Sequence, residues 1–354
     1  MALVAHYPAL NRPDGPLVSV CIAHYRGPEL IAACLDSVLE QQCDFRFEII
    51  VHDDASPDDS VAFLREKYPQ VELLASRENA GFCVANNRMV AHARGEYVLL
   101  LNNDAALLAD ALAALALAAT RQTSPGILTL PQYDWESGDL VDRGCMLDPF
   151  YNPVPNLDPE RSEVAMVIGA CLWIPRSTWE QLGGFPEWFE SIGEDLYLCC
   201  AARLAGLAVR ALKESGYLHR QGGSFGGNKP LRGKLSSTYR RRRLSERNKT
   251  FSLFVMTPTI VMWPLLLIHL TLLLIEGIIL SVLRRDLKAC TQIYLNVPRE
   301  LFYKRVTLGK ARRKLQGACL VSLTSFGKPF KILPHKFTML CRYGLPTLDW
   351  RPSR

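Results

Sequence analysis

The chain has 354 residues, 49% of them hydrophobic, which is enough for two domains or one large domain with an appendage and excludes a disordered protein. Its eleven cysteines include no CxxC pair, so we expect reduced thiols and no zinc site. Residues 1–15 contain no apolar run typical of a signal peptide, so we expect a cytoplasmic chain. The net charge of +6 is unevenly distributed: residues 284–354 carry 16 Lys and Arg against three Asp and Glu, which predicts an anionic partner for this tail.

Strand and helix patterns alternate through the first hundred residues. Apolar runs predict buried strands over 17–23, 47–51, 71–75 and 97–101. Amphipathic patterns predict helices over 29–41, 61–68 and 83–93. This alternation predicts an α/β fold, a parallel sheet with helices on both faces. The chain has no GxGxxG and no Walker lysine motif, which argues against a standard dinucleotide fold and a P-loop NTPase.

Polar side chains follow these strands where each strand ends. Asp53 and Asp54 come after the second strand, and Asn103 and Asp104 come after the fourth. Open α/β sheets bind ligands at this carboxyl edge. A divalent cation that bridges Asp104 to a diphosphate would explain the second group. The alternative is an Asp that caps a helix expected over 105–119.

An apolar segment precedes the basic tail. Residues 251–283 contain no Lys, Arg or Asp and only one Glu. Pro258 and Pro264 argue against one continuous helix, and 265–283 is just long enough to cross a bilayer. Because both flanks are basic, we expect a re-entrant or interfacial helical hairpin with the tail on an anionic membrane surface. A core helix or a homo-oligomer interface is the alternative, and no nucleic-acid-binding motif accompanies the tail.

Seven segments, in this order, resemble family 2 glycosyltransferases with the GT-A fold, and rhamnosyltransferases in particular. They are LVSVCIAHYRGPELIAACLDSVLEQ, IIVHDDASPDDS, ENAGFCVANNRM, LLLNNDA, VIGACLWIPRSTWEQLGGF, GEDLYLCCAARLAG and HRQGGS. The resemblance implies a Rossmann-like mixed sheet with helices on both faces and a C-terminal helical membrane-associated region. The implied parts are an N-terminal extension (1–15), a glycosyltransferase domain (16–250, its nucleotide-sugar half 16–105 and its acceptor half 106–250), the hydrophobic segment (251–283) and the basic tail (284–354).

The resemblance also implies a binding site for a UDP- or dTDP-sugar donor. Ala23 and Tyr25 would flank the base, and Asp53 or Asp54 would bond to the uracil or thymine edge. An Asx turn is the alternative for this acidic pair. The remaining implied donor-binding residues come from the next loop and helix, the metal motif and the basic segment before the apolar run: Asn79, Gly81, Asn86, Asn103, Asp104 and Arg247.

Metal and catalytic residues are implied in the same way. Asp104 corresponds to the last Asp of the family's metal motif, and His219 matches a histidine that completes the metal site in many relatives, so Mn²⁺ or Mg²⁺ is the expected cofactor. Asp195 would be the base that takes the acceptor's proton in an inverting transfer, with Glu194 binding the acceptor. A pair of acids at the N-terminus of a helix over 196–204 is the alternative.

The acceptor half is less specific. Trp173 and Trp188 are candidates for stacking on an acceptor sugar, although such residues more often belong to the core. Tyr197 replaces the second Asp of the frequent EDxD form. The Gln-x-x-Arg-Trp motif of processive relatives is absent, which predicts transfer of one sugar at a time.

These observations predict a metal-dependent hexosyltransferase at the cytoplasmic face of the inner cell membrane, peripheral or re-entrant. It would act on a lipid-linked or oligosaccharide acceptor in cell-envelope polysaccharide biosynthesis. A polyprenyl-phosphate glycosyltransferase and a catalytically silent nucleotide-sugar-binding scaffold are the alternatives.

Overall fold

The computed structural model describes residues 3–122, 124–220, 230–231, 234–344 and 347–349. The chain forms two compact units. The first comprises residues 1–145, 155–202 and 207–220, and the second comprises residues 146–154, 203–206 and 221–354. This division differs from the expected boundary at residue 250, because the helix Tyr239–Met256 packs with the helices that follow it.

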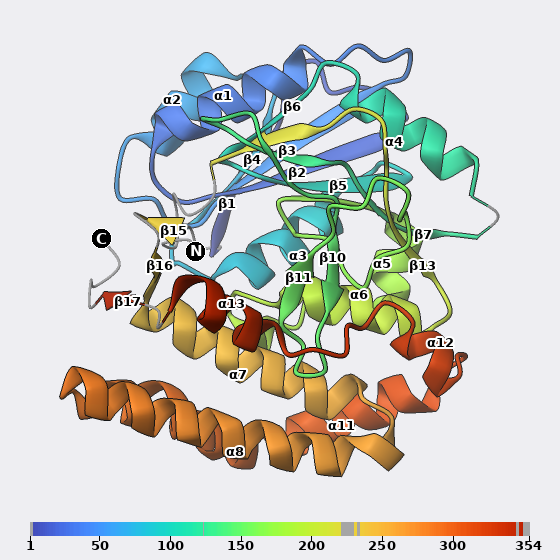
Figure 1. Cartoon of the computed structure of the whole chain (residues 1–354). Helices are drawn as coiled ribbons and strands as arrows, with labels where there is room; N and C mark the ends of the chain where they lie inside the picture. The colour runs from blue at the N-terminus through green and yellow to red at the C-terminus, as the bar shows by residue number, and fades with distance from the viewer. Residues whose placement is uncertain (1–2, 123, 221–229, 232–233, 345–346, 350–354) are drawn as a thin grey trace. The chain divides into compact units, whose positions relative to one another are not determined.

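The first unit is built on an eight-stranded mixed sheet (Figure 1). Its strands are β1 (Val4–Tyr7), β2 (Val18–His24), β3 (Phe47–Asp53), β4 (Glu72–Ser76), β5 (Tyr97–Asn102), β7 (Gly126–Thr129), β12 (Cys171–Pro175) and β13 (Ala208–Ala211). The order is β1-β4-β3-β2-β5-β12-β7-β13. Strands β2 to β5 are parallel, which confirms the predicted arrangement. The expected N-terminal extension supplies β1, which is antiparallel to β4 at the edge of the sheet.

Helices cover both faces of this sheet, as expected. They are α1 (Pro28–Leu39), α2 (Ser60–Lys67), α3 (Phe82–His92), α4 (Ala111–Thr120), α5 (Arg176–Leu182), a 3-10 helix (Glu187–Phe189) and α6 (Glu194–Leu204). Figure 1 shows α1 and α2 on one face and α3 on the other. Val20 and Ile22 of β2 join a core cluster with Ile31 and Leu35 of α1. Because successive residues of a strand point to opposite faces, the mainly apolar strand β2 is buried on both sides.

The helix expected over 105–119 begins later in the structure. Residues Ala105–Leu107 form β6, and α4 begins only at Ala111. Strand β6 belongs to a four-stranded sheet with β14 (Tyr217–His219), β8 (Gln132–Asp134) and β9 (Leu140–Asp142), in the order β6-β14-β8-β9. Since β6 is antiparallel to β14, Ala105 lies opposite His219. Asp104 therefore leads into a strand and does not cap a helix. Two further short strands, β10 (Cys145–Leu147) and β11 (Pro153–Pro155), pair with each other.

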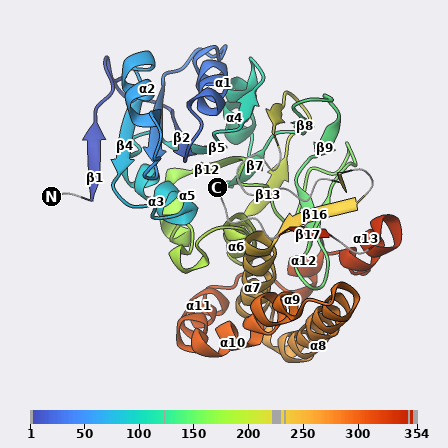
Figure 2. The same ribbon diagram turned by 90° about the vertical axis from the view of Figure 1, so that its left-hand side faces the viewer.

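The second unit is mainly helical. Its helices are α7 (Tyr239–Met256), α8 (Thr259–Arg284), α9 (Leu287–Ala289), a π-helix (Cys290–Tyr294), α10 (Asn296–Tyr303), α11 (Arg305–Gly317), α12 (Leu323–Gly327) and α13 (His335–Tyr343). Three short strands, β15 (Pro230–Leu231), β16 (Lys234–Thr238) and β17 (Thr347–Asp349), form a small sheet. Figure 2 shows α8 to α11 gathered along one edge of this unit, and α8, α9, the π-helix, α10 and α11 each contact the next element in the chain.

The apolar segment is interrupted at Pro258 but not at Pro264. Helix α7 ends at Met256 and α8 begins directly after Pro258, as the fixed φ of proline predicts. The expectation that Pro264 interrupts the helix is wrong, because α8 passes through it without a break. The expected hairpin within 251–283 is not found, because residues 259–283 belong to the single helix α8, and the helix that precedes it, α7, is largely polar. Within the described residues, Thr259–Leu283 is the one helix long and apolar enough to cross a membrane, by length and composition alone.

Candidate functional site

The carboxylates of Asp53 and Asp54, at the end of β3, have different partners. Asp54 accepts backbone N–H bonds from Ala80 (2.7 Å) and Gly81 (2.9 Å), one on each oxygen. Asp53 is 1% exposed, and its Oδ1 accepts from Ser56 N (3.0 Å). Its Oδ2 is buried with no hydrogen-bond partner in the described part of the chain. Burial raises the pKa of both carboxyls. Asp54 therefore holds the following loop, whereas Asp53 has an acceptor available for a ligand.

The loop over Asn79–Gly81 is fixed against the end of β3. Asn79 Nδ2 donates to the carbonyl of Asp54 (3.2 Å). Gly81 has a φ of +89°, and a Cβ there would lie 3.4 Å from the carbonyl of Glu190. The loop needs glycine at this position because of that conformation. Asn86 is buried in α3 and donates to Phe82 O within the helix (2.9 Å), so its contact with a donor stays a prediction.

Sequence reasoning missed His24, which lies between the predicted Ala23 and Tyr25. Its Nε2 lies 2.9 Å from Ser60 Oγ and its Nδ1 lies 3.0 Å from Asn103 Nδ2. Burial lowers the pKa of His24 to about 4, so the ring is neutral at pH 7 and its Nδ1 accepts the hydrogen bond that Asn103 Nδ2 donates. Ala23 is half-buried at the end of β2 and Tyr25 is 41% exposed. The only feature of the sequence that could have identified His24 was its position, because it is a polar residue at the end of a buried strand.

Asp104 and His219, the predicted metal ligands, face each other although they are 115 residues apart. His219 Nε2 lies 3.2 Å from Asp104 Oδ1, and both residues are buried. On the other side of the ring, His219 Nδ1 lies 3.3 Å from Gln132 Oε1, which also accepts from Tyr217 OH (2.7 Å). Gln132 thereby orients the imidazole, as second partners of metal-binding histidines do. Sequence reasoning missed Gln132 because its three-residue strand carries no motif.

This pair fits a divalent cation that a donor diphosphate helps to bind. A carboxylate oxygen and an imidazole nitrogen are ligands that Mn²⁺ accepts. The residues that the structure describes contain no group of three or more His, Cys, Asp or Glu side chains suited to a metal. Asp104 and His219 would therefore supply two ligands, and phosphate oxygens and water would fill the remaining positions.

Asp195 lies in the first turn of α6, where its carboxylate is oriented by backbone groups. Gly169 N donates to Oδ2 (2.9 Å), and Leu196 N donates to Oδ1 (2.7 Å). The side chain remains half-buried, whereas the neighbouring Glu194 is 6% exposed. A carboxylate that is held in one orientation and still accessible is suited to act as a base. The position of Asp195 in the first turn of α6 also agrees with the alternative that Glu194 and Asp195 are acids at a helix N-terminus.

Two contacts bring Asp195 to the region of the donor loop and the metal pair. A Cβ at Gly169 would lie 3.6 Å from Asp195 Cβ and 4.0 Å from the ring of Phe82, the residue after the donor loop. The adjacent Ala170 accepts a hydrogen bond from Asn102 N (3.1 Å), at the end of β5. The donor loop, the end of β5 and the start of α6 therefore meet at one edge of the first unit.

The two tryptophans predicted to bind the acceptor lie in different surroundings. Trp173 is 0% exposed and stacks on Tyr97 with ring centroids 5.0 Å apart, so the prediction that it stacks on a sugar is wrong. Its indole packs in the core of the first unit and lines a pocket at the start of β5, away from the candidate site. Trp188 is half-buried, and its ring packs edge-on against Phe189 (4.7 Å) and Tyr197 (6.0 Å). Trp188 stays a predicted acceptor residue.

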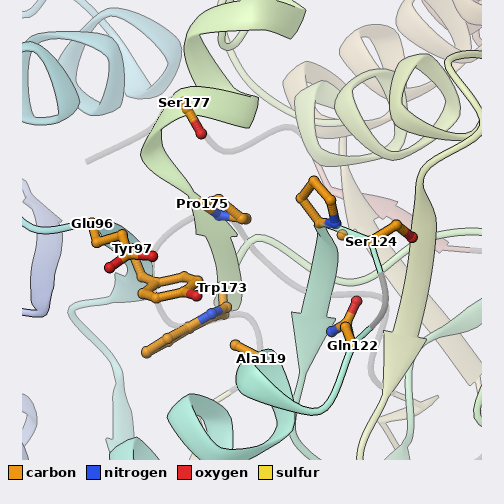
Figure 3. A pocket seen from close by; sticks show the side chains of 10 residues that line it. Glu96, Tyr97, Ala119, Gln122, Ser124, Trp173, Pro175 and Ser177 are labelled. Atoms are coloured by element: carbon orange, nitrogen blue, oxygen red, sulfur yellow. The ribbon is translucent and has the colours of Figure 1, made fainter.

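A pocket of about 270 Å³ lies elsewhere in the first unit (Figure 3). Glu96, Tyr97 and Trp173 contribute to its lining. Strand β5 runs from Tyr97 to Asn102, so this pocket lies at the start of the strand, whereas Asp104 follows its end. The pocket is therefore not part of the candidate site.

Arg247 belongs to α7 in the second unit. It is 5% exposed, its Nε donates to Asn248 Oδ1 (2.9 Å), and its guanidinium lies 5.8 Å from the centroid of Phe251. Its contact with a donor stays a prediction. The part of the HRQGGS segment at 221–224 lies outside the described residues.

Comparisons with known proteins support this fold. The model of the family described as "Glycosyl transferase family 2" matches residues 19–182. Uncharacterized protein MT1568 of Mycobacterium tuberculosis is 37% identical over 105 residues, which is 29% of this chain and 33% of that protein. Chondroitin synthase of Escherichia coli is 30% identical over 195 residues, 52% of this chain and 26% of that protein. The chain thus spans a third or less of these relatives.

A solved structure gives the same result for the fold. The crystal structure of GalNAc-T7 with UDP, GalNAc and Mn²⁺ has a TM-score of 0.54 to this chain at 17% sequence identity. The match covers 68% of this chain and 48% of that one. The mixed sheet of the first unit therefore has the GT-A fold expected from the sequence.

Proposed function

Since the chain carries a domain of glycosyl transferase family 2, we propose that it transfers one sugar from a UDP- or dTDP-sugar. The transfer inverts the anomeric configuration, and the acceptor is a lipid-linked or cell-surface glycan. The observation that carries the proposal is the contact between Asp104 and His219. The nucleotide and Mn²⁺ in the GalNAc-T7 structure and the glycan product named for chondroitin synthase support this reading.

Donor binding is divided among residues at the ends of β3 and β5. Asp53 Oδ2 accepts the imide N–H of a uracil or thymine, which supplies the missing partner of that buried oxygen. Asp54 keeps the loop at Asn79–Gly81 closed against the nucleoside. Asp104 and His219 would hold the divalent cation, whose chemistry when bound is to neutralise charge that develops on the diphosphate.

Asp195 performs the proton transfer. The acceptor hydroxyl attacks the anomeric carbon from the side opposite the diphosphate, and the bond from that carbon to the phosphate oxygen breaks with its electron pair leaving on the nucleoside diphosphate. Asp195 takes the hydroxyl proton, while the N–H groups of Gly169 and Leu196 hold its carboxylate in place. Glu194 orients the acceptor beside it.

The test is release of nucleoside diphosphate from a panel of UDP-, dTDP- and GDP-sugars. The full chain is assayed with host-membrane lipid extract, and with Mn²⁺ or a chelator. We expect release from one donor that needs both metal and extract. Asp104→Ala and Asp195→Asn should each lower the rate by about 100-fold or more, whereas Asp139→Asn, a change at an exposed acid, should not.

Two other outcomes have defined meanings. No release from any donor, despite measurable nucleotide binding, would overturn the enzyme assignment in favour of a silent scaffold. Activity that survives Asp195→Asn would indicate a lipid phosphate as acceptor, because a phosphate oxygen needs no deprotonation at neutral pH.

A further inference from the structure

Between Thr259 and Leu283, helix α8 carries its two titratable side chains, His269 and Glu276, on the inward side, whereas its exposed side is apolar except for its two threonines. Alternating spacings of four and three residues define one inward stripe along the helix. The stripe consists of Met262, Leu266, His269, Leu273, Glu276 and Leu280. A surface helix of a soluble protein shows the opposite polarity, with its charged and polar residues facing outward.

The polar residues of the stripe are held by the second unit itself. His269 Nε2 lies 2.8 Å from Thr250 Oγ1, and Glu276 is paired with Arg242. Lys336 Nζ of α13 lies 2.8 Å from the other oxygen of Glu276. Because Arg242 meets residue 276 and Thr250 meets residue 269, α7 runs antiparallel along α8. This pairing fixes which side of α8 faces inward.

The opposite side of α8 is a continuous apolar surface, which we call the outer face. Its large side chains are between 46% and 79% exposed: Ile260, Trp263, Leu267, Ile268, Leu272, Ile275, Ile278, Ile279, Val282 and Leu283. Between Thr259 and Leu283 the only Asp, Glu, Lys or Arg is Glu276, which belongs to the inward stripe together with His269. An apolar surface of this extent on an otherwise folded unit marks an interaction site.

Basic residues follow the outer face along the chain, and we call them its basic border. Arg285 and Lys288 are exposed directly after α8. On α10 and α11, the guanidinium of Arg299 lies 5.4 Å from the Tyr303 ring, and that of Arg305 lies 4.4 Å from the Phe302 ring. Both rings are 62% exposed. Exposed aromatic rings beside Arg and Lys are typical of residues that lie at the headgroup level of a bilayer.

We propose that the outer face of α8 and its basic border dock on an anionic lipid bilayer, with α8 lying in the plane of the interface rather than crossing it. A crossing α8 would carry with it α7, which lies along it and contains Arg240, Arg241, Arg242 and Arg243, and charge in the hydrocarbon core is expensive. A second copy of the chain fits less well, because its own outer face supplies no anionic partner for the exposed Arg285 and Lys288. This inference does not depend on transfer activity.

Vesicle flotation of the full chain tests the docking, because vesicle-bound protein rises in a density gradient whereas protein assemblies do not. We expect binding to phosphatidylcholine vesicles that contain about one third phosphatidylglycerol at about 0.1 M salt, and at least tenfold weaker binding at about 0.5 M salt or without the anionic lipid. Arg285→Gln with Lys288→Gln should weaken binding by about tenfold or more. The triple variant Leu267→Gln, Ile275→Gln and Val282→Gln should abolish it.

Leu117→Gln with Leu140→Gln is the matched control, since both side chains are exposed and belong to the first unit. It should bind as the unchanged chain does. Because every substituted side chain is exposed, thermal melts without lipid should remain similar for all variants. Absence of binding to anionic vesicles would overturn the proposal, and so would an equal loss of vesicle binding in the control variant. A discrete dimer that does not bind vesicles would assign the outer face to a second copy of the chain.

The depth of α8 distinguishes the two membrane orientations. In a Trp263→Phe background, tryptophan is placed in turn at Leu267, Ile275 and Val282, and quenching by lipids brominated at different depths is compared. An in-plane helix predicts the same shallow depth at all three positions. A deep central position flanked by shallow ends would show a crossing helix and overturn the in-plane part of the proposal.

Discussion

Asp53 and Asp54 are adjacent, but the physical demands on their carboxylates differ. Asp54 uses both oxygens for backbone N–H groups, so it contributes to the folded loop whether or not a ligand is bound. Asp53 keeps one buried oxygen without a partner in the described residues, an arrangement that costs stability unless a ligand supplies the donor.

This difference predicts opposite effects of two conservative substitutions. Asp53→Asn should weaken UDP or dTDP binding by about 10- to 100-fold with little loss of thermal stability, because only the ligand's bond is affected. Asp54→Asn should destabilise the fold by about 1–3 kcal/mol, because one backbone N–H loses its acceptor. Calorimetric titration with nucleotide and thermal melts of both variants measure the two effects. Full nucleotide affinity in Asp53→Asn would contradict the assignment.

Asp142 is a second buried carboxyl with a measurable consequence. It is 3% exposed, accepts a bond from Gly144 N (3.0 Å), and burial raises its pKa to about 7. Since this value lies above the unfolded value of about 3.9, the folded state holds the proton more tightly than the unfolded state does. Stability therefore falls as pH rises from about 4 to 7 and then levels off.

Asp142→Asn should remove this pH dependence, because the amide keeps an acceptor for Gly144 N and carries no charge. We expect the variant to be more stable than the unchanged chain by roughly 1–4 kcal/mol at pH 8, with a difference that vanishes near pH 4. Melting temperatures of both proteins between pH 4 and 8.5 give the comparison. A stability difference that stays constant across this range would count against the raised pKa.

Among the elements, α8 shows how closely the second unit is packed on its inward side. A Cβ at Gly277 would lie 2.8 Å from Cβ of Tyr294, whose hydroxyl donates to Glu276 (3.0 Å). Neither atom at this contact belongs to the flexible end of a side chain, so the helix or the π-helix must move to admit a methyl group.

Gly277→Ala should therefore destabilise the chain by about 1–3 kcal/mol despite the better helix propensity of alanine. Gly309→Ala is the matched control, since Gly309 lies inside α11 with nothing within 4 Å of the Cβ position. It should stabilise by about 0.5–1 kcal/mol. Denaturant unfolding of the two variants measures both changes, and equal effects would show that helix propensity rather than packing decides.

The same elements show what a sequence can predict. Strands β2 to β5 follow from long apolar runs that end in polar residues, which is a local signal. Strand β6 has only three residues and exists because it pairs with β14, more than a hundred residues away, so no local pattern marks it. Gln132 is placed beside His219 by the same long-range pairing. Pro264 disfavours a helix locally, but burial of Met262 and Leu266 on both sides of it outweighs that cost.

For the whole molecule, charge and apolar exposure are unevenly distributed along the chain. Residues 1–283 total −7 and residues 284–354 total +13, and the outer face of α8 adjoins the basic part. A net charge of +6 is enough to keep a small domain soluble only where no large apolar patch is exposed. In water without lipid, the outer face has no partner of matching polarity.

We therefore expect the purified chain to form concentration-dependent assemblies in detergent-free buffer and to become monodisperse when nonionic micelles are added. The driving force is burial of the outer face, at about 25 cal/mol per Å² of apolar surface, and it exceeds the mutual repulsion of the basic borders once salt screens them. Light scattering behind size-exclusion chromatography measures the effect. Raising the salt concentration should enlarge the assemblies, because salt screens the repulsion between the basic borders. Assemblies held together by attraction between the acidic part of one copy and the basic part of another would instead dissolve at high salt. The triple variant at Leu267, Ile275 and Val282 should remain monodisperse without detergent. Assemblies of undiminished size in that variant would show that another surface drives the assembly.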